Sequence, residues 1–180
     1  VRPGVPIYLA ALGPKMIELA GETADGVLLN WASPDYLRQA RDHIRRGAEK
    51  AGRNPEDIDV ACYLRTAVVD DLERVKPELR GQIARYFRMP YYRDYFRQMG
   101  FEEETAAVSQ ALARSDTATA AAAISDEMQS ELGIFGTAEE CRQRIEHLRS
   151  LGLRQPVIAP FMVGDDANES FRATIGAFSG

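Results

Sequence analysis

Cysteine, histidine and tryptophan are scarce in this chain of 180 residues, which holds two cysteines, two histidines and one tryptophan. Cys62 and Cys141 lie far apart in different predicted elements, so they form neither a metal-ligand spacing nor a redox pair. His43 and His147 lie in predicted helices with no carboxylate or cysteine at a useful spacing, and we interpret both as solvated. The pattern predicts no metal site and no histidine-based triad, and the cysteine usage predicts a reducing cytoplasm.

Long apolar runs and excess positive charge are also missing. The 22 Lys and Arg residues are outnumbered by 27 Asp and Glu residues, which gives a net charge of −5. This balance argues against a nucleic-acid partner, and no run approaches the roughly 18 apolar residues that a membrane span needs. The hydrophobic content of 45% is that of a globular protein, and no stretch has the composition of a linker. We therefore predict a single domain over residues 1–180.

The start of the chain is abrupt. It begins at Val1 without Met and enters a predicted strand within six residues. We interpret the chain as a fragment of a longer protein.

Four predicted strands alternate with helices along the chain. The strands are Ile7–Ala10, Gly26–Leu29, Ile58–Val69 and Val157–Ala159. Because they are almost continuously apolar and each is followed by helix, they predict an α/β fold with a parallel sheet covered by helices. Four such units form either an open doubly wound sheet or half of an eight-stranded barrel, and composition does not choose between these.

Helix starts are marked clearly in two places. Ser33 followed by Pro34 is typical of a helix N-terminus, and Thr137 with Glu140 forms a capping box. A long helical insertion is predicted at about 71–135, after the third strand, with a break near residues 115–116. Its aromatic and basic run, residues 85–96, either lines a planar substrate or packs the insertion over the sheet, and packing is the commoner explanation.

The junction between the first strand and its helix is the best candidate site. Its residues are Ala10, Ala11, Leu12, Gly13 and Pro14. A helix that starts at the carboxyl end of a strand points backbone N–H groups at whatever lies above the sheet, which suits a phosphate. Alternatively, the Gly-Pro pair only starts a helix. Lys15 either adds a positive charge or faces the solvent.

A second candidate follows the second strand. Asn30 and Trp31 come at its carboxyl end, the rim at which barrel enzymes bind ligands. Asn30 either donates and accepts hydrogen bonds there or makes a turn, and Trp31 either walls a pocket or packs under the insertion. Arg65, within the third strand, is costly to bury alone, and we interpret it as structural.

Five motifs in order resemble the luciferase-like flavin and deazaflavin oxidoreductases. They are Pro6–Pro14, Leu19–Gly21, Ala24–Gly26, Ser125–Met128 and Phe135–Ile145. The nearest likeness is to the coenzyme F420-dependent branch that includes methylenetetrahydromethanopterin reductase, and it covers essentially the whole chain. The resemblance implies a TIM barrel of about twice this length, of which the chain is the C-terminal half, strands five to eight.

The resemblance also implies the activity. The whole enzyme would transfer a hydride between coenzyme F420 and a small organic substrate, with an FMN-dependent monooxygenase as the alternative and a non-catalytic half-barrel or assembly module as the second. It implies cofactor contacts at Ala10–Pro14 and Asn30 and a substrate pocket at Asn30 and Trp31. The residues of proton chemistry are expected in the missing N-terminal half, so this chain alone is expected to be inactive. Its expected partners are that half or further copies of itself in a homo-oligomer.

Overall fold

The computed structural model describes residues 4–179, and the chain divides into two compact units. Unit 1 comprises Val1–Leu64 and Ile145–Ile158, and unit 2 comprises Arg65–Arg144 and Ala159–Gly180. That the two units form the single domain predicted from the sequence stays a prediction.

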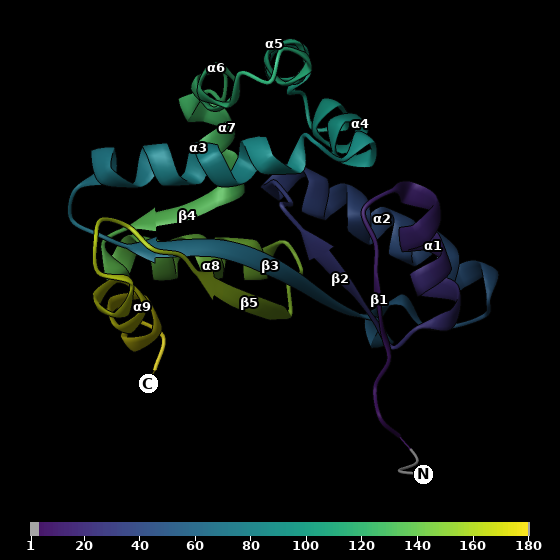
Figure 1. The fold of residues 1–180 in the computed structure, drawn as a ribbon. Helices are drawn as coiled ribbons and strands as arrows, with labels where there is room; N and C mark the ends of the chain where they lie inside the picture. The colour runs from purple at the N-terminus through teal and green to yellow at the C-terminus, as the bar shows by residue number, and fades with distance from the viewer. Residues whose placement is uncertain (1–3, 180) are drawn as a thin grey trace. The chain divides into compact units, whose positions relative to one another are not determined.

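Unit 1 begins with strands and helices in strict alternation (Figure 1). Its elements are β1 (Tyr8–Ala10), α1 (Pro14–Thr23), β2 (Gly26–Asn30), α2 (Pro34–Lys50) and the first part of β3 (Asp59–Val68). The helix starts follow the sequence signals. Ser33 caps α2 by accepting a hydrogen bond from the Tyr36 N–H at 3.1 Å, and Pro34 takes the first helical position.

The three strands of unit 1 pair in parallel and in chain order, as predicted. Residues 8–10 of β1 lie opposite residues 26–28 of β2, and residues 26–30 of β2 lie opposite residues 59–63 of β3. Because right-handed crossovers in one direction put their helices on one face, α1 and α2 cover the same side of these strands. Val27 and Leu29 are fully buried on that side. The side chains of the other side are more exposed, with Tyr63 at 42%.

α1 and α2 pack backbone against backbone because glycines stand at their contact. A Cβ on Gly47 would lie 2.8 Å from the carbonyl carbon of Glu18, and a Cβ on Gly21 would lie 3.0 Å from the amide nitrogen of Ala48. Real Cβ atoms do not approach other atoms so closely. The glycine in the Leu19–Gly21 motif is therefore required by helix packing.

Unit 2 contains most of the helical insertion. Its helices are α3 (Val75–Tyr86), α4 (Pro90–Gln98), α5 (Glu102–Ala113), α6 (Thr117–Ala122), α7 (Asp126–Leu132), the first part of α8 (Ala138–Ser150) and α9 (Ala167–Gly176). The predicted break falls between α5 and α6, where Ser115 has a φ of 58°. The capping box also forms, since the Glu140 carboxylate accepts from the Thr137 N–H at 2.8 Å.

The structure has a strand that the sequence pattern did not predict. β4 (Gly133–Gly136) pairs in parallel with residues 65–68 of β3, so the described chain has five strands where four were expected, and the insertion is not wholly helical. Four residues between a helix and a capping box are too few to show a strand periodicity. The last predicted strand is β5 (Gln155–Pro160), which pairs with β3.

The aromatic run of the insertion packs as a small core within unit 2. Phe87 and Phe96 are fully buried, with ring centroids 4.8 Å apart, and Tyr92 and Tyr95 are buried beside them. Tyr91 remains 58% exposed. The packing explanation fits four of these five side chains. In the described part of the chain, no helix has both the length and the apolar composition needed to cross a membrane.

We expect Gly47→Ala to destabilise the protein strongly. The added methyl group overlaps the Glu18 backbone, which neither helix can relieve without moving apart. Overpacking of this kind costs about 1–3 kcal/mol, so the free energy of unfolding in urea should fall by about that amount.

Gly81→Ala is the matched control for this prediction. Gly81 also lies inside a helix, α3, but a Cβ there meets nothing within 4 Å. Removing a helical glycine without a clash stabilises by about 0.5–1 kcal/mol. If both substitutions changed the urea midpoint in the same way, the close backbone contact between α1 and α2 would not be the reason that Gly47 must be glycine.

Candidate functional site

The β1–α1 junction lies at the carboxyl edge of the unit 1 sheet. β1 is continued by Ala11, whose N–H donates to the Leu28 carbonyl of β2 at 3.1 Å. Gly13 is the N-cap of α1 and Pro14 occupies the first turn. Among residues 4–179, no side chain caps this helix start, in contrast to the Ser33 cap of α2. The backbone at the start of α1 is thus not covered by a capping side chain.

Neither a left-handed backbone nor close packing explains why residue 13 is glycine. Its φ of −89° and ψ of 156° lie in the extended region that any residue adopts. A Cβ at this position would meet nothing within 4 Å. Within the described chain, neither backbone conformation nor packing requires glycine here, and the space beside it is open to an approaching group.

The second junction stands beside the first because β1 and β2 are parallel neighbours. Asn30 ends β2, is half-buried, and lies opposite Tyr63 of β3 in the strand register. Trp31 follows with a φ of 54°, a left-handed conformation that costs a bulky residue about 1–3 kcal/mol. Trp31 is only 1% exposed, so protein atoms rather than solvent cover its side chain.

The predicted site residues differ in how far a ligand can reach them. Ala10 is exposed, and Leu12, Gly13 and Pro14 are half-buried. Ala11 is only 5% exposed, so it supports the junction from inside. Lys15 is exposed on the first turn of α1, as expected for a solvent-facing lysine.

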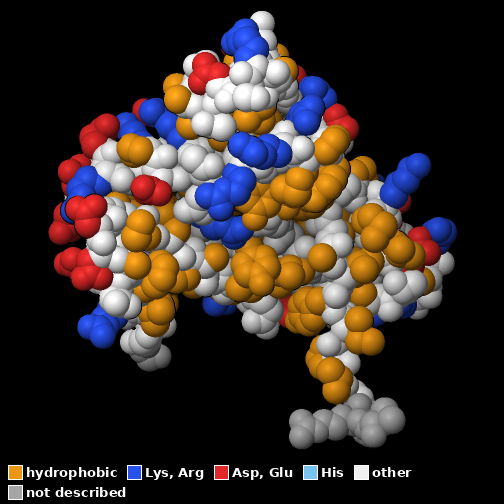
Figure 2. Space-filling view, in the orientation of Figure 1, with side chains coloured by type: hydrophobic (Ala, Val, Ile, Leu, Met, Phe, Trp, Pro, Cys, Tyr) orange, Lys and Arg blue, Asp and Glu red, His pale blue; other side chains and the backbone are white. Residues whose placement is uncertain are grey.

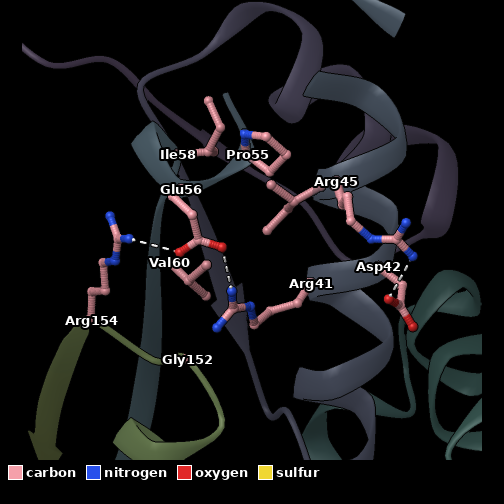
Figure 3. Close-up of a pocket in the computed structure, with 10 residues that line it drawn as sticks. Arg41, Asp42, Arg45, Pro55, Glu56, Ile58, Val60, Gly152 and Arg154 are labelled. Carbon is pink, nitrogen blue, oxygen red and sulfur yellow. Dashed lines mark hydrogen bonds and ion pairs between the residues drawn. The ribbon is translucent and has the colours of Figure 1, made fainter. Parts of the chain in front are cut away.

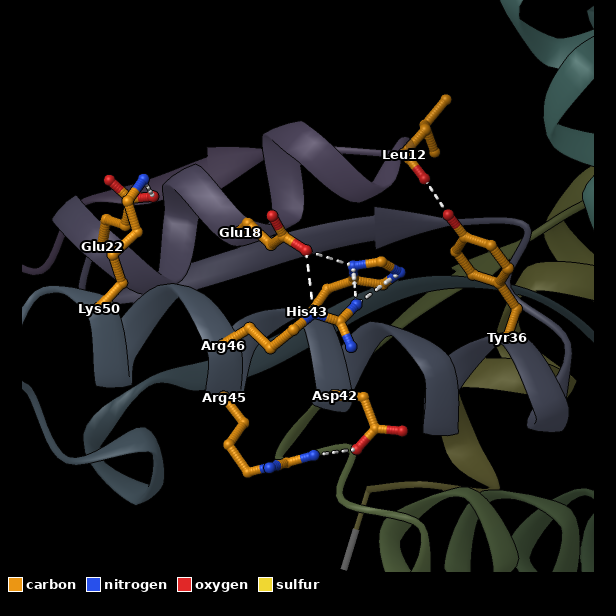
Figure 4. Close-up of polar contacts among 9 residues, drawn as sticks. All are labelled: Leu12, Glu18, Glu22, Tyr36, Asp42, His43, Arg45, Arg46 and Lys50. Carbon is orange, nitrogen blue, oxygen red and sulfur yellow. Dashed lines mark hydrogen bonds and ion pairs between the residues drawn. The ribbon is translucent and has the colours of Figure 1, made fainter.

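Two tyrosines join this site that the sequence pattern did not select. Tyr63 projects from the same sheet face as Asn30, one strand away. Tyr36, in the first turn of α2, donates its hydroxyl hydrogen bond to the Leu12 carbonyl (Figure 4). Strand alternation left open which face of the sheet Tyr63 takes. Nothing in the sequence indicated that Tyr36 of α2 would contact the loop before α1.

Of the two histidines interpreted as solvated, His147 is exposed, whereas His43 has partners. The Nδ1 atom of His43 on α2 lies 2.9 Å from the Glu18 carboxylate on α1, which also accepts from Arg46 Nε at 3.1 Å (Figure 4). These contacts lower the pKa of Glu18, the hydrogen bond with His43 being the larger cause. The helical spacing within α2 did not reveal this carboxylate because it comes from the neighbouring helix.

A cavity of about 130 Å³ lies at the opposite end of the strands from these junctions (Figure 3). Ile58 and Val60, at the start of β3, form part of its wall. Glu56 accepts from Arg41 at 3.0 Å and from Arg154 at 3.3 Å inside it. The cavity is smaller than the 300–1,000 Å³ typical of ligand pockets, and its charges pair with one another. We interpret it as a packing defect closed by ion pairs.

Unit 2 positions the remaining polar candidates. Arg65, interpreted from the sequence as structural, donates to the Tyr86 hydroxyl at 2.9 Å. Both cysteines are buried and reduced, and burial raises the pKa of the Cys141 thiol to about 11. Across residues 4–179, no three His, Cys, Asp or Glu side chains gather as metal ligands would.

Comparison with known proteins identifies relatives of the chain. It is 34% identical over 171 residues to a 5,10-methylenetetrahydromethanopterin reductase of Methanolobus tindarius, covering 93% of this chain and 52% of the relative. The corresponding reductase of Archaeoglobus fulgidus is 30% identical over 177 residues, covering 95% of this chain and 53% of the relative. The chain thus spans about half the length of the curated relatives it matches.

A solved structure confirms the fold. The coenzyme F420-dependent tetrahydromethanopterin reductase of Methanopyrus kandleri superposes with a TM-score of 0.77 at 26% identity, over 97% of this chain and 51% of that one. The expected α/β fold, similar to about half of this reductase, is therefore confirmed. Residues 1–155 match the luciferase-like monooxygenase family. The chain belongs to the luciferase-like monooxygenase family.

Proposed function

We propose that this chain forms the C-terminal half of a coenzyme F420-dependent oxidoreductase that transfers a hydride between the deazaflavin and an organic substrate. The observation that carries the proposal is the uncapped start of α1 beside the open space at Gly13. The names of the relatives support it, since the Methanopyrus kandleri structure is that of an F420-dependent reductase.

In this proposal both junctions contact the ligands. Ala10, Leu12, Gly13 and Pro14 contact the cofactor, with Ala11 supporting them from inside, and the dipole of α1 favours negative charge at its start. Asn30 offers an amide to the ring or substrate, while Trp31 holds the turn that presents it. Bound F420 supplies the hydride chemistry, and the protein's part is positioning and electrostatics. No side chain of this chain is assigned as a catalytic acid or base.

The alternatives differ in the ligand they bind. An FMN-dependent monooxygenase would use the same barrel with FMN, and a non-catalytic half-barrel would bind neither cofactor. Titration of the full-length protein with F420 and with FMN separates the three. Tight binding of FMN alone would favour the monooxygenase. A cytoplasmic location, predicted from the cysteine usage, stays a prediction.

We expect Gly13→Val to abolish F420 binding by the full-length protein while leaving its fold intact. A Cβ at this position meets nothing within 4 Å among the described residues, so we expect the valine side chain to occupy the space through which a ligand would approach. Fluorescence titration measures the loss, and circular dichroism checks the fold.

Lys15→Ala is the control for this experiment. Lys15 is exposed, so its screened charge contributes about 1 kcal/mol or less, and F420 affinity should fall only a few-fold. Unchanged affinity in Gly13→Val with a native spectrum would mean that the junction is only a helix start.

The partner of this chain is proposed from its exposed apolar surface. β1 pairs only with β2 among the described strands, and Ile7 beside it is 69% exposed. Met16 and Leu19 of α1 are 42% and 40% exposed, and Figure 2 shows hydrophobic side chains along this stretch. We propose that the N-terminal half-barrel, or another copy of the chain, covers this edge, because open strand edges and apolar patches associate.

The isolated chain should therefore self-associate in sedimentation velocity experiments, with a mass that rises with concentration. Ile7→Glu should weaken this association by placing a charge at the strand edge. Leu72→Glu, a control at an apolar side chain 44% exposed in unit 2, should leave it unchanged. A compact monomer at all concentrations would refute the proposed edge.

A further inference from the structure

One buried tyrosine connects the two junctions of the candidate site. Tyr36 comes from α2 and is only 3% exposed. Its hydroxyl donates to the carbonyl oxygen of Leu12, in the loop between β1 and α1 (Figure 4). Its own N–H is held by Ser33 Oγ at 3.1 Å, directly after the turn at Trp31. A single side chain thus joins the first turn of α2 to the loop after β1.

The bond to Leu12 has a consequence for Gly13. The Leu12 carbonyl and the Gly13 N–H belong to one planar trans peptide, so they point in opposite directions. A hydroxyl that holds the carbonyl toward α2 therefore turns the Gly13 N–H away from α2. Tyr36 therefore fixes the orientation of the Gly13 N–H without contacting it, through its hydrogen bond to the Leu12 carbonyl.

The β1–α1 junction needs such a restraint because its own residues do little to fix the orientation of the peptide between Leu12 and Gly13. Glycine loses more conformational freedom on ordering than any other residue, and among the described residues nothing lies within 4 Å of where a Cβ on Gly13 would be. Pro14 keeps the preceding residue extended but leaves the peptide between Leu12 and Gly13 free to rotate. The hydrogen bond from the Tyr36 hydroxyl to the Leu12 carbonyl is the contact that fixes this peptide.

We propose that Tyr36 is a positioning residue of the cofactor site, holding the Leu12–Gly13 peptide so that the Gly13 N–H is presented to an acceptor oxygen of the ligand. This inference rests on the proposed function. Burial raises the pKa of Tyr36 to about 12, so the hydroxyl stays protonated and able to donate throughout the neutral range.

Tyr36→Phe tests the proposal because it removes the hydroxyl and keeps the ring. In the full-length protein, the dissociation constant for F420 should rise about five- to tenfold, the value of one buried hydrogen bond. The KM for F420 should rise with it, while kcat at saturating F420 stays unchanged. Hydrogen exchange of the segment 11–17 should also quicken without any cofactor.

Tyr8→Phe is the matched control. Tyr8 lies in the same unit and donates its hydroxyl hydrogen bond to Asp59, but at the amino ends of the strands. The same chemical change there should leave both F420 affinity and exchange of the segment 11–17 as in the parent protein.

The two readouts separate the possible failures. If the parent protein binds no F420, the proposed function fails, while faster exchange in Tyr36→Phe alone would still establish the restraint on the peptide. If the parent binds F420 and Tyr36→Phe binds it equally well with unchanged exchange, the positioning role is overturned. An equal loss of affinity in Tyr8→Phe would also overturn it, because the effect would then be general destabilisation.

Discussion

The close backbone contact between α1 and α2 is the constraint on which the candidate site depends. Gly21 and Gly47 let the helices approach until a Cβ at either position would collide with the opposite backbone. This approach brings the first turn of α2 near the start of α1, so that Tyr36 reaches Leu12. Wider packing would separate the two loops. Gly21, a motif glycine eight residues after Gly13, thus contributes to the geometry of the junction.

The two ends of the unit 1 sheet serve different purposes. The amino ends hold paired charges, with Glu56 between Arg41 and Arg154, and the Tyr8 hydroxyl on Asp59. The carboxyl ends hold an uncapped helix start and a residue in a left-handed turn. Parallel strands put all their carboxyl ends at one edge, which is the edge where barrel enzymes bind ligands.

The insertion shows how the same residue types serve packing rather than binding. Four of its aromatic side chains form a core within unit 2, and Tyr86 accepts the hydrogen bond of Arg65. An arginine in an apolar strand is tolerated because its charge finds a hydroxyl and a ring, with its guanidinium carbon 6.0 Å from the Tyr86 centroid. Runs of aromatic and basic residues alone do not distinguish these roles.

The sequence by itself determined the local elements and their order. The cap at Ser33, the capping box at Thr137 and the parallel order of β1, β2 and β3 follow from short-range chemistry and apolar periodicity, and all are present. Both junctions could be located because the end of a strand is a local signal.

Contacts between distant segments were decided only by the tertiary structure. The short strand β4 exists because β3 offers it an edge, and the partner of His43 comes from another helix. Tyr36 reads in sequence as an ordinary first-turn residue, and its bond to Leu12 spans 24 positions. Periodicity reports which face a side chain takes, but the atom it meets there depends on how closely the helices pack.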